Sequence, residues 1–210
     1  MYTLYYSPGT ASLVVHWLLI ELGIEHELKL VDLDARAHKS PEYLALNPSG
    51  VVPTLIVDGE AVTECAALTL LLAERHPEAG LEPARASRAR ALYLQWVVYL
   101  ANSLQPAFRI WFYAAEAAGV DNADAAKARA RERIEAVNAR LDAHLSAHGP
   151  YICGEQLTAV DFLATMLLRW SRNMPKPATD WPALAAYAAR MKSRPSFQEL
   201  YRREALTDWA

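Results

Sequence analysis

Residues 46–76 of this 210-residue chain read LNPSGVVPTLIVDGEAVTECAALTLLLAERH, and this stretch decides how the N-terminal part folds. The NPSG segment at 47–50 predicts a loop, because proline fixes φ and glycine tolerates positive φ. A D-G pair then separates two β-prone segments, which predicts a hairpin with strands at 54–57 and 60–62. Thr63 can cap a following helix, so we expect a loop, a hairpin and a helix in that order.

Two features of this stretch favour a ligand-binding edge. Pro53 lacks an N–H just before a strand, which predicts an edge or a tight bend, and a cis Val52–Pro53 bond fits such a bend. The bend would leave the N–H and C=O of Val52 free to pair with an extended ligand. The turn at 63–65 would direct unpaired helix N–H groups toward the same edge, where they can bind a carboxylate. An ordinary hairpin followed by a core helix is the alternative interpretation.

Composition and charge exclude several classes of protein. With 53% hydrophobic and 21% charged residues, the chain is an ordinary globular protein. A net charge of −3 predicts no nucleic-acid partner, and the basic cluster at 127–133 includes Glu132, so we interpret it as a solvated helix face. Cys65 and Cys153 form no C-x-x-C motif, which favours a reduced compartment. Without a predicted signal peptide or membrane span, we expect a cytoplasmic protein.

The N-terminal segments predict a thioredoxin-like domain at 1–79. A strand at 2–6 precedes a helix that starts near Ser12 and ends at Gly23, and a second strand is expected at 27–33. A polar connection then leads to the hairpin and helix described above. This β-α-β unit followed by β-β-α is typical of a thioredoxin-like domain.

The remainder of the chain predicts an all-helical domain. Pro77, Gly80 and Pro83 indicate a linker at 80–86, and everything in 87–210 reads as helical. Pro106 should kink the first long helix, and Thr158 with Asp161 forms a capping box before a buried helix. The expected helices cover 87–118, 122–147 and 162–168, with two more that begin at Pro182 and Pro195.

Taken together, these motifs resemble the glutathione site of the cytosolic glutathione transferases: an N-P-x-G-x-V-P loop, a D-G hairpin, then a T/S-E-S/C turn. An α/β domain followed by an all-helical domain is also similar to that family's fold. S-P-G-x-x-S-L-x-x-H at 7–16 and Y-I-C-G at 151–154 resemble its bacterial beta class most closely. The resemblance covers the whole chain and implies a homodimer that uses glutathione as co-substrate. We expect no metal.

The resemblance also implies how glutathione is held. The backbone of Val52 would pair with the cysteinyl part of glutathione, with Pro53 in the cis form. Glu64 and the Cys65 backbone would hold the γ-glutamyl end.

Other positions match different classes or depart from the beta class. His38 and Lys39 resemble the pair that holds the glycyl carboxylate in phi-class enzymes, although a loop lysine can equally be solvated. Ala11 stands where the beta class carries a cysteine, which excludes a mixed disulfide with glutathione there. Gln105 occupies the place of a beta-class histidine; it can donate a hydrogen bond but carries no proton at neutral pH, and it can also simply face solvent.

The chemical requirement is a thiolate, and a free thiol with a pKa near 8.5 is mostly protonated at neutral pH. Lowering that pKa by about two units takes roughly 2.7 kcal/mol. A hydroxyl donor to a charged sulfur supplies about 1.5–3 kcal/mol, and a helix N-terminus adds about 0.3–1 kcal/mol. One Ser or Thr therefore suffices. Thr10 is the first candidate, Ser12 the second and Tyr6 the third, while Thr10 and Ser12 can also act only as helix caps.

An aromatic segment predicts the place of the second substrate. Phe108, Trp111 and Phe112 lie within little more than one helical turn, and with Gln105 they would line an apolar pocket. The same side chains can instead pack between domains or subunits.

The leading hypothesis is a glutathione transferase that conjugates glutathione to small hydrophobic electrophiles, a detoxification reaction. One alternative is a non-catalytic binding or regulatory protein of the same fold, which the loss of the beta-class cysteine and histidine favours. Another is a different glutathione-dependent activity, such as a peroxidase, an isomerase or a dehalogenase. The S-S-C-S motif of the isomerases is absent from the sequence, which weakens that branch alone.

Overall fold

The computed structural model describes residues 1–209 and divides into two compact units. One comprises Met1–Glu82 together with the C-terminal stretch from Lys192, and the other comprises Pro83–Met191. We had expected all of 87–210 in one helical domain. The C-terminal stretch groups with the first unit because α10 (Pro195–Arg203) packs on α1 (Leu13–Glu21). There the Trp17 Nε1–H donates to Ser196 Oγ at 2.8 Å.

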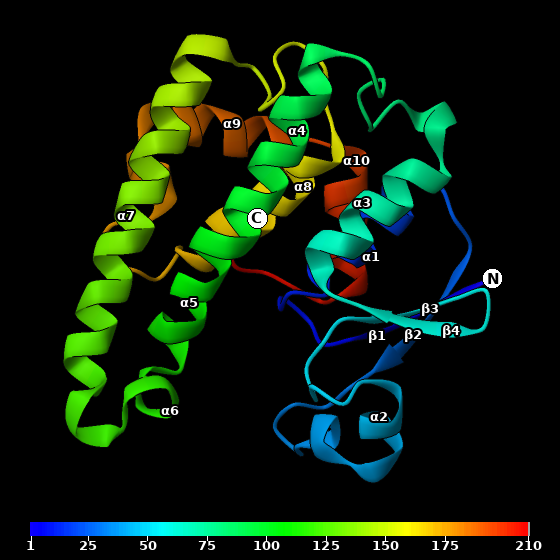
Figure 1. Cartoon of the computed structure of the whole chain (residues 1–210), viewed down its shortest axis with the longest axis vertical. Helices are drawn as coiled ribbons and strands as arrows, with labels where there is room; N and C mark the ends of the chain where they lie inside the picture. Colours follow the sequence, from blue (N-terminus) through cyan, green and yellow to red (C-terminus); the bar gives the residue numbers. More distant parts are fainter. Residues whose placement is uncertain (210) are drawn as a thin grey trace. The chain divides into compact units, whose positions relative to one another are not determined.

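A four-stranded mixed sheet forms the centre of the first unit, in the order β2-β1-β3-β4. β1 (Tyr2–Tyr6) pairs in parallel with β2 (His26–Leu30), and in antiparallel with β3 (Thr54–Val57). β3 in turn pairs with β4 (Glu60–Thr63) as the predicted D-G hairpin. Figure 1 shows α1 and α3 (Cys65–Arg75) on one side of the sheet and α2 (Pro41–Leu46) on the other. The predicted thioredoxin-like domain is confirmed.

Local structure differs from the prediction at two places in this unit. The polar connection contains a 3-10 turn at Ala37–Lys39 and then α2 (Pro41–Leu46), whose first turn is capped by Ser40. The expected cap at Thr63 is wrong, because Thr63 pairs with Thr54 as the last residue of β4. The helix begins one residue later, after Glu64.

The second unit is entirely helical, as predicted. Its expected first helix, 87–118, is interrupted by a π-helical segment directly before α5, where Pro106 cannot donate a backbone hydrogen bond. In the described part of the chain, no helix is long and apolar enough to cross a membrane. The helices of the second unit are α4 (Arg88–Tyr99), the π-helical η3 (Leu100–Leu104), α5 (Gln105–Phe112), α6 (Ala114–Ala118), α7 (Ala123–His148), α8 (Ala159–Trp170) and α9 (Pro182–Lys192).

The predicted capping box is confirmed at the start of α8, which is buried along nearly its whole length. The Asp161 carboxylate accepts hydrogen bonds from the backbone N–H groups of Ile152 and Thr158 at 2.9 and 2.8 Å. It also accepts from the hydroxyls of Thr158 and Tyr187, both at 3.0 Å. One carboxylate therefore joins α8, α9 and the loop before α8.

Burial makes Asp161 a source of pH-dependent stability. The four hydrogen bonds lower the pKa of Asp161, but the loss of hydration on burial raises it by more, so that the pKa moves from 3.8 to about 6. A folded-state pKa above the unfolded value means that protonation favours the folded chain. The contribution of Asp161 to stability should therefore fall as the pH rises from about 4 to about 6, and stay constant above that window. Urea unfolding of the native chain and Asp161→Asn across pH 4–7 tests this: the difference in unfolding free energy should change with pH only in that window. A constant difference would contradict the prediction.

Candidate glutathione site

The register of the sheet brings three predicted site segments to one end of the first unit. Tyr5 of β1 lies opposite Thr54 of β3, and Thr54 lies opposite Thr63 of β4. Because these strands are antiparallel, the turn after β1, the residues before β3 and the residues after β4 emerge at the same end. These segments contain Thr10, Val52 and Glu64 respectively.

The turn between β1 and α1 is tied together by hydroxyl groups. Ser12 is fully buried; its Oγ donates to Ser7 O at 3.0 Å and accepts from Ser7 N at 3.1 Å. Ser12 starts α1 without a side-chain cap bond to the helix, contrary to its predicted alternative role as a cap. Thr10 is only half-buried, and its Oγ1 donates to the same Ser7 O at 2.7 Å and lies 3.0 Å from Ser12 Oγ. Of the two hydroxyls, Thr10 is the accessible one.

A buried acid from the C-terminal stretch braces this turn. Glu204 accepts from the Gly9 N–H at 2.8 Å and contacts His16 Nδ1 at 2.8 Å. Burial and the Glu204 carboxylate raise the pKa of Tyr6, the third predicted thiol donor. Sequence reasoning missed Glu204, because nothing local marks a residue far along the chain as a partner of the first turn.

Val52 has the predicted form of a ligand-pairing edge. Its side chain is buried and its bond to Pro53 is cis, as expected. Within residues 1–209, neither its N–H nor its C=O has a hydrogen-bond partner. The backbone of Val52 can therefore pair with an extended ligand through both groups.

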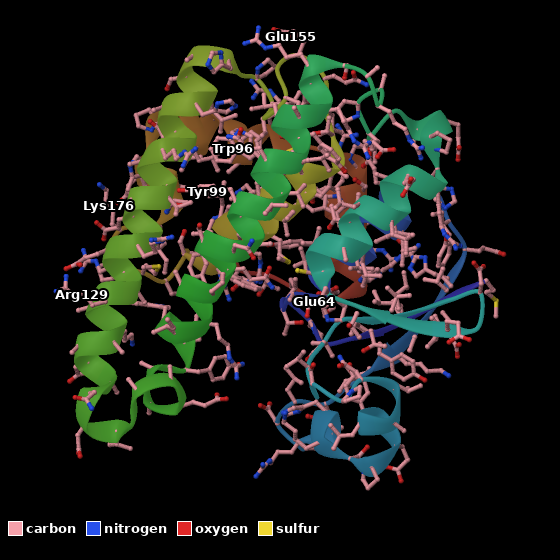
Figure 2. The ribbon with its side chains drawn as sticks, in the orientation of Figure 1. Glu64, Trp96, Tyr99, Arg129, Glu155 and Lys176 are labelled. Carbon is pink, nitrogen blue, oxygen red and sulfur yellow. The ribbon has the colours of Figure 1, made fainter. Side chains whose placement is uncertain are left out.

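Glu64 lies at the start of α3 with an exposed side chain (Figure 2). Its φ of 70° and ψ of 107° are rare for a residue with a Cβ, and such strain is concentrated at ligand sites. Among the described residues, no basic side chain pairs with its carboxylate. Cys65, which follows, is buried, so its thiol is not an accessible group at this position.

His38 and Lys39 lie in the 3-10 turn beside the NPSG loop. Lys39 Nζ donates to Gly50 O at 3.0 Å, so this lysine is not merely solvated. Gly50 has a φ of 57°, and a Cβ there would meet Lys39 Nζ at 2.8 Å. The glycine of the motif therefore gives the lysine room to approach the loop.

In the second unit, the predicted pocket residues divide between two faces of α5. Phe108 is fully buried, while Phe112 is 52% exposed and stacks on it with ring centroids 6.1 Å apart. Trp111 instead lies under Lys127 of α7, at 4.6 Å. Trp170, at the end of α8, contacts both phenylalanine rings edge-on, and its sequence position did not indicate this. Gln105 is half-buried at the start of α5.

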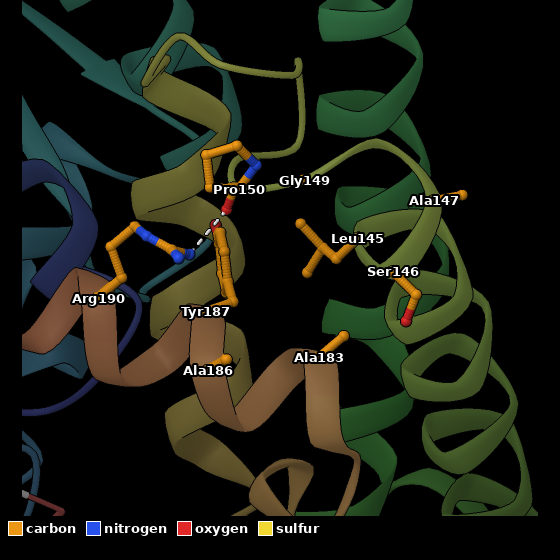
Figure 3. A pocket seen from close by; sticks show the side chains of 9 residues that line it. All are labelled: Leu145, Ser146, Ala147, Gly149, Pro150, Ala183, Ala186, Tyr187 and Arg190. Atoms are coloured by element: carbon orange, nitrogen blue, oxygen red, sulfur yellow. Dashed lines mark hydrogen bonds between the residues drawn. The ribbon is translucent and has the colours of Figure 1, made fainter.

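Two cavities in the second unit lie elsewhere. One, of about 230 Å³, is lined by the end of α7 and by α9, with Tyr187 and Arg190 among its walls (Figure 3). The other, of about 390 Å³, lies among α5, α6 and α7. Neither is lined by the predicted pocket residues.

Two family models match this chain: the glutathione S-transferase N-terminal domain over residues 10–75, and the glutathione S-transferase C-terminal domain over residues 124–190. Together with the fold, they place the chain in the cytosolic glutathione transferase family, and the protein is an enzyme of that family.

Individual relatives agree. Glutathione S-transferase GST-4.5 of Xanthomonas campestris pv. campestris is 32% identical over 97% of this chain and 98% of its own length. The solved structure of a sphingomonad glutathione S-transferase complexed with glutathione is 33% identical, with a TM-score of 0.84 over 98% of this chain and 100% of that one. A bacterial beta class glutathione S-transferase from Sphingomonas chungbukensis is 29% identical, with the same TM-score and the same coverage of both chains. The predicted resemblance to the beta class is confirmed.

Proposed function

We propose that this protein conjugates the glutathione thiolate to small hydrophobic electrophiles, with the Thr10 hydroxyl stabilising the thiolate. The observation that carries the proposal is the convergence of Thr10, the unpaired N–H and C=O of Val52 and the Glu64 carboxylate at one end of the sheet. In this arrangement Val52 pairs with the cysteinyl part of glutathione, and Glu64 with the Cys65 backbone binds the γ-glutamyl end.

The hydroxyl cluster supports Thr10 as the donor. Ser7 O accepts from both Thr10 Oγ1 and Ser12 Oγ. When the Thr10 proton rotates toward a thiolate, Ser12 still satisfies Ser7 O, so no buried acceptor is left unpaired. Ser12 thereby supports the donor from a fully buried position.

Other parts of the proposal rest on chemistry and on the relatives. Lys39 beside Gly50 would supply a positive charge for the glycyl carboxylate, and His38 belongs to the same turn. An apolar electrophile would contact the aromatic group formed by Phe108, Phe112 and Trp170. We further propose that the chain acts in the cytoplasm as a homodimer.

Titration of bound glutathione tests the proposed thiolate. In ultraviolet difference titration of the native complex, the thiol pKa should lie about two units below its free value. Thr10→Ala should return it most of the way toward the free value, because it removes a hydrogen bond to a charged sulfur. Ser12→Ala should have a smaller effect, because it acts only through Thr10.

Thr3→Ala serves as the matched control. Thr3 of β1 also carries a hydroxyl, which donates to the Glu27 carboxylate of β2 in an exposed hydrogen bond. If native glutathione binds with an unshifted thiol pKa, the non-catalytic alternative replaces the proposal. A shift that survives Thr10→Ala would transfer the role to Ser12 or Tyr6.

A further inference from the structure

A buried polar network binds the carbonyl of the Val51–Val52 peptide, whose N–H is that of Val52. Tyr43 and Asn47, which are 5% and 1% exposed, come from α2 and its C-terminal cap. The Tyr43 hydroxyl and the Asn47 Nδ2–H each donate to the carbonyl oxygen of Val51 at 2.7 Å. Because a carbonyl oxygen has two lone pairs, these two side chains engage it completely. Both also contact Thr54 Oγ1, at 2.9 and 3.2 Å.

These two hydrogen bonds set the direction of the neighbouring N–H. The carbonyl of Val51 and the N–H of Val52 belong to one planar peptide, which is trans. In a trans peptide the C=O and the N–H point in opposite directions. Holding the Val51 C=O toward the buried network therefore aims the Val52 N–H away from it.

Further contacts fix both ends of this arrangement. The Val52 side chain packs in a small apolar cluster with Val31 and Tyr43. Tyr43 therefore contacts Val52 with its ring and holds the Val51 carbonyl with its hydroxyl. The Asn47 Oδ1 accepts from the Ser49 N–H at 3.1 Å, which orients the Asn47 amide so that its Nδ2 faces Val51.

We propose that Tyr43 and Asn47 are positioning residues for glutathione. They orient the Val52 N–H toward a carbonyl of the cysteinyl segment, and they do so without touching the ligand. This inference rests on the proposed function, since it concerns the affinity of the same site. Preorganisation of this kind lowers the ordering cost of binding.

Two measurements on the full chain test the inference: glutathione affinity by calorimetry, and the Val52 amide resonance by ¹H–¹⁵N NMR. In the native chain, saturating glutathione should move the Val52 amide proton downfield, as a new hydrogen bond does. Tyr43→Phe removes only the hydroxyl; it should weaken binding roughly fivefold and reduce the shift, and Asn47→Ala should do the same. The thiol pKa of bound glutathione should stay at its native value, because Thr10 is untouched.

Thr54→Val is the matched control. It removes the hydroxyl that Tyr43 and Asn47 share but leaves both donors to Val51 O, so affinity and Val52 shift should stay within about twofold of native. Native values in both Tyr43→Phe and Asn47→Ala, or an equal loss in Thr54→Val, would overturn the inference and leave the proposed function standing. If the native chain binds no glutathione, the proposed function fails and the inference fails with it.

Discussion

Glu64→Ala should weaken glutathione binding roughly a hundredfold, because under the proposed function it removes the carboxylate that pairs with the charged γ-glutamyl amino group. The structure gives this carboxylate no basic partner among the described residues and holds its backbone at a φ of 70°. Both features favour a role for Glu64 in binding a ligand over a role in stabilising the fold. Calorimetric titration with glutathione measures the effect directly.

Two further variants test whether the charge at this position matters: one removes only the charge of Glu64, and the other removes a neighbouring acid as a control. Glu64→Gln keeps the side-chain length and should also lose most of the affinity. Glu60→Ala removes an exposed acid from the adjacent strand of the same hairpin and should bind glutathione as the native chain does. Unchanged affinity in Glu64→Ala would show that the γ-glutamyl end binds elsewhere, and the placement of the whole site would have to be revised.

Asp161→Ala should lower the free energy of unfolding by about 4 kcal/mol, because it leaves two buried backbone N–H groups and two hydroxyls without their acceptor. The alanine also removes the reciprocal half of the capping box of α8. Urea unfolding at pH 7 measures the loss, which corresponds to a fall in melting temperature of roughly 10 °C.

Asp180→Ala is the appropriate control, since Asp180 is an exposed acid in the 3-10 turn before α9. It should change stability by less than about 0.5 kcal/mol. Thr158→Ala should fall between the two, because the backbone donors to Asp161 remain. If the two variants Asp161→Ala and Asp180→Ala had similar free energies of unfolding, the hydrogen bonds to Asp161 would contribute little net stability and the prediction would be wrong.

Much of this architecture could be predicted because it depends on local chemistry. The D-G pair produces its hairpin, Pro182 and Pro195 begin helices, and Thr158 with Asp161 caps α8, each within a few residues of its signal. The prediction failed where pairing or packing with another segment decided the local structure. Thr63 continued the strand instead of capping the helix, because pairing with Thr54 offered its backbone hydrogen bonds.

The sequence by itself determined the family and the N-terminal fold, and it predicted the parts of the site: the Val52–Pro53 edge, the acid at Glu64 and a hydroxyl in the first turn. Only the tertiary structure decided which of two hydroxyls is accessible, since Ser12 is fully buried while Thr10, which donates to the same Ser7 carbonyl, is only half-buried. It also supplied Glu204 behind the first turn and Tyr43 behind Val51, neither of which has a local signal. The physical reason is the same in each case: an unpaired buried polar group costs free energy, and the packing of distant segments decides which partner it meets.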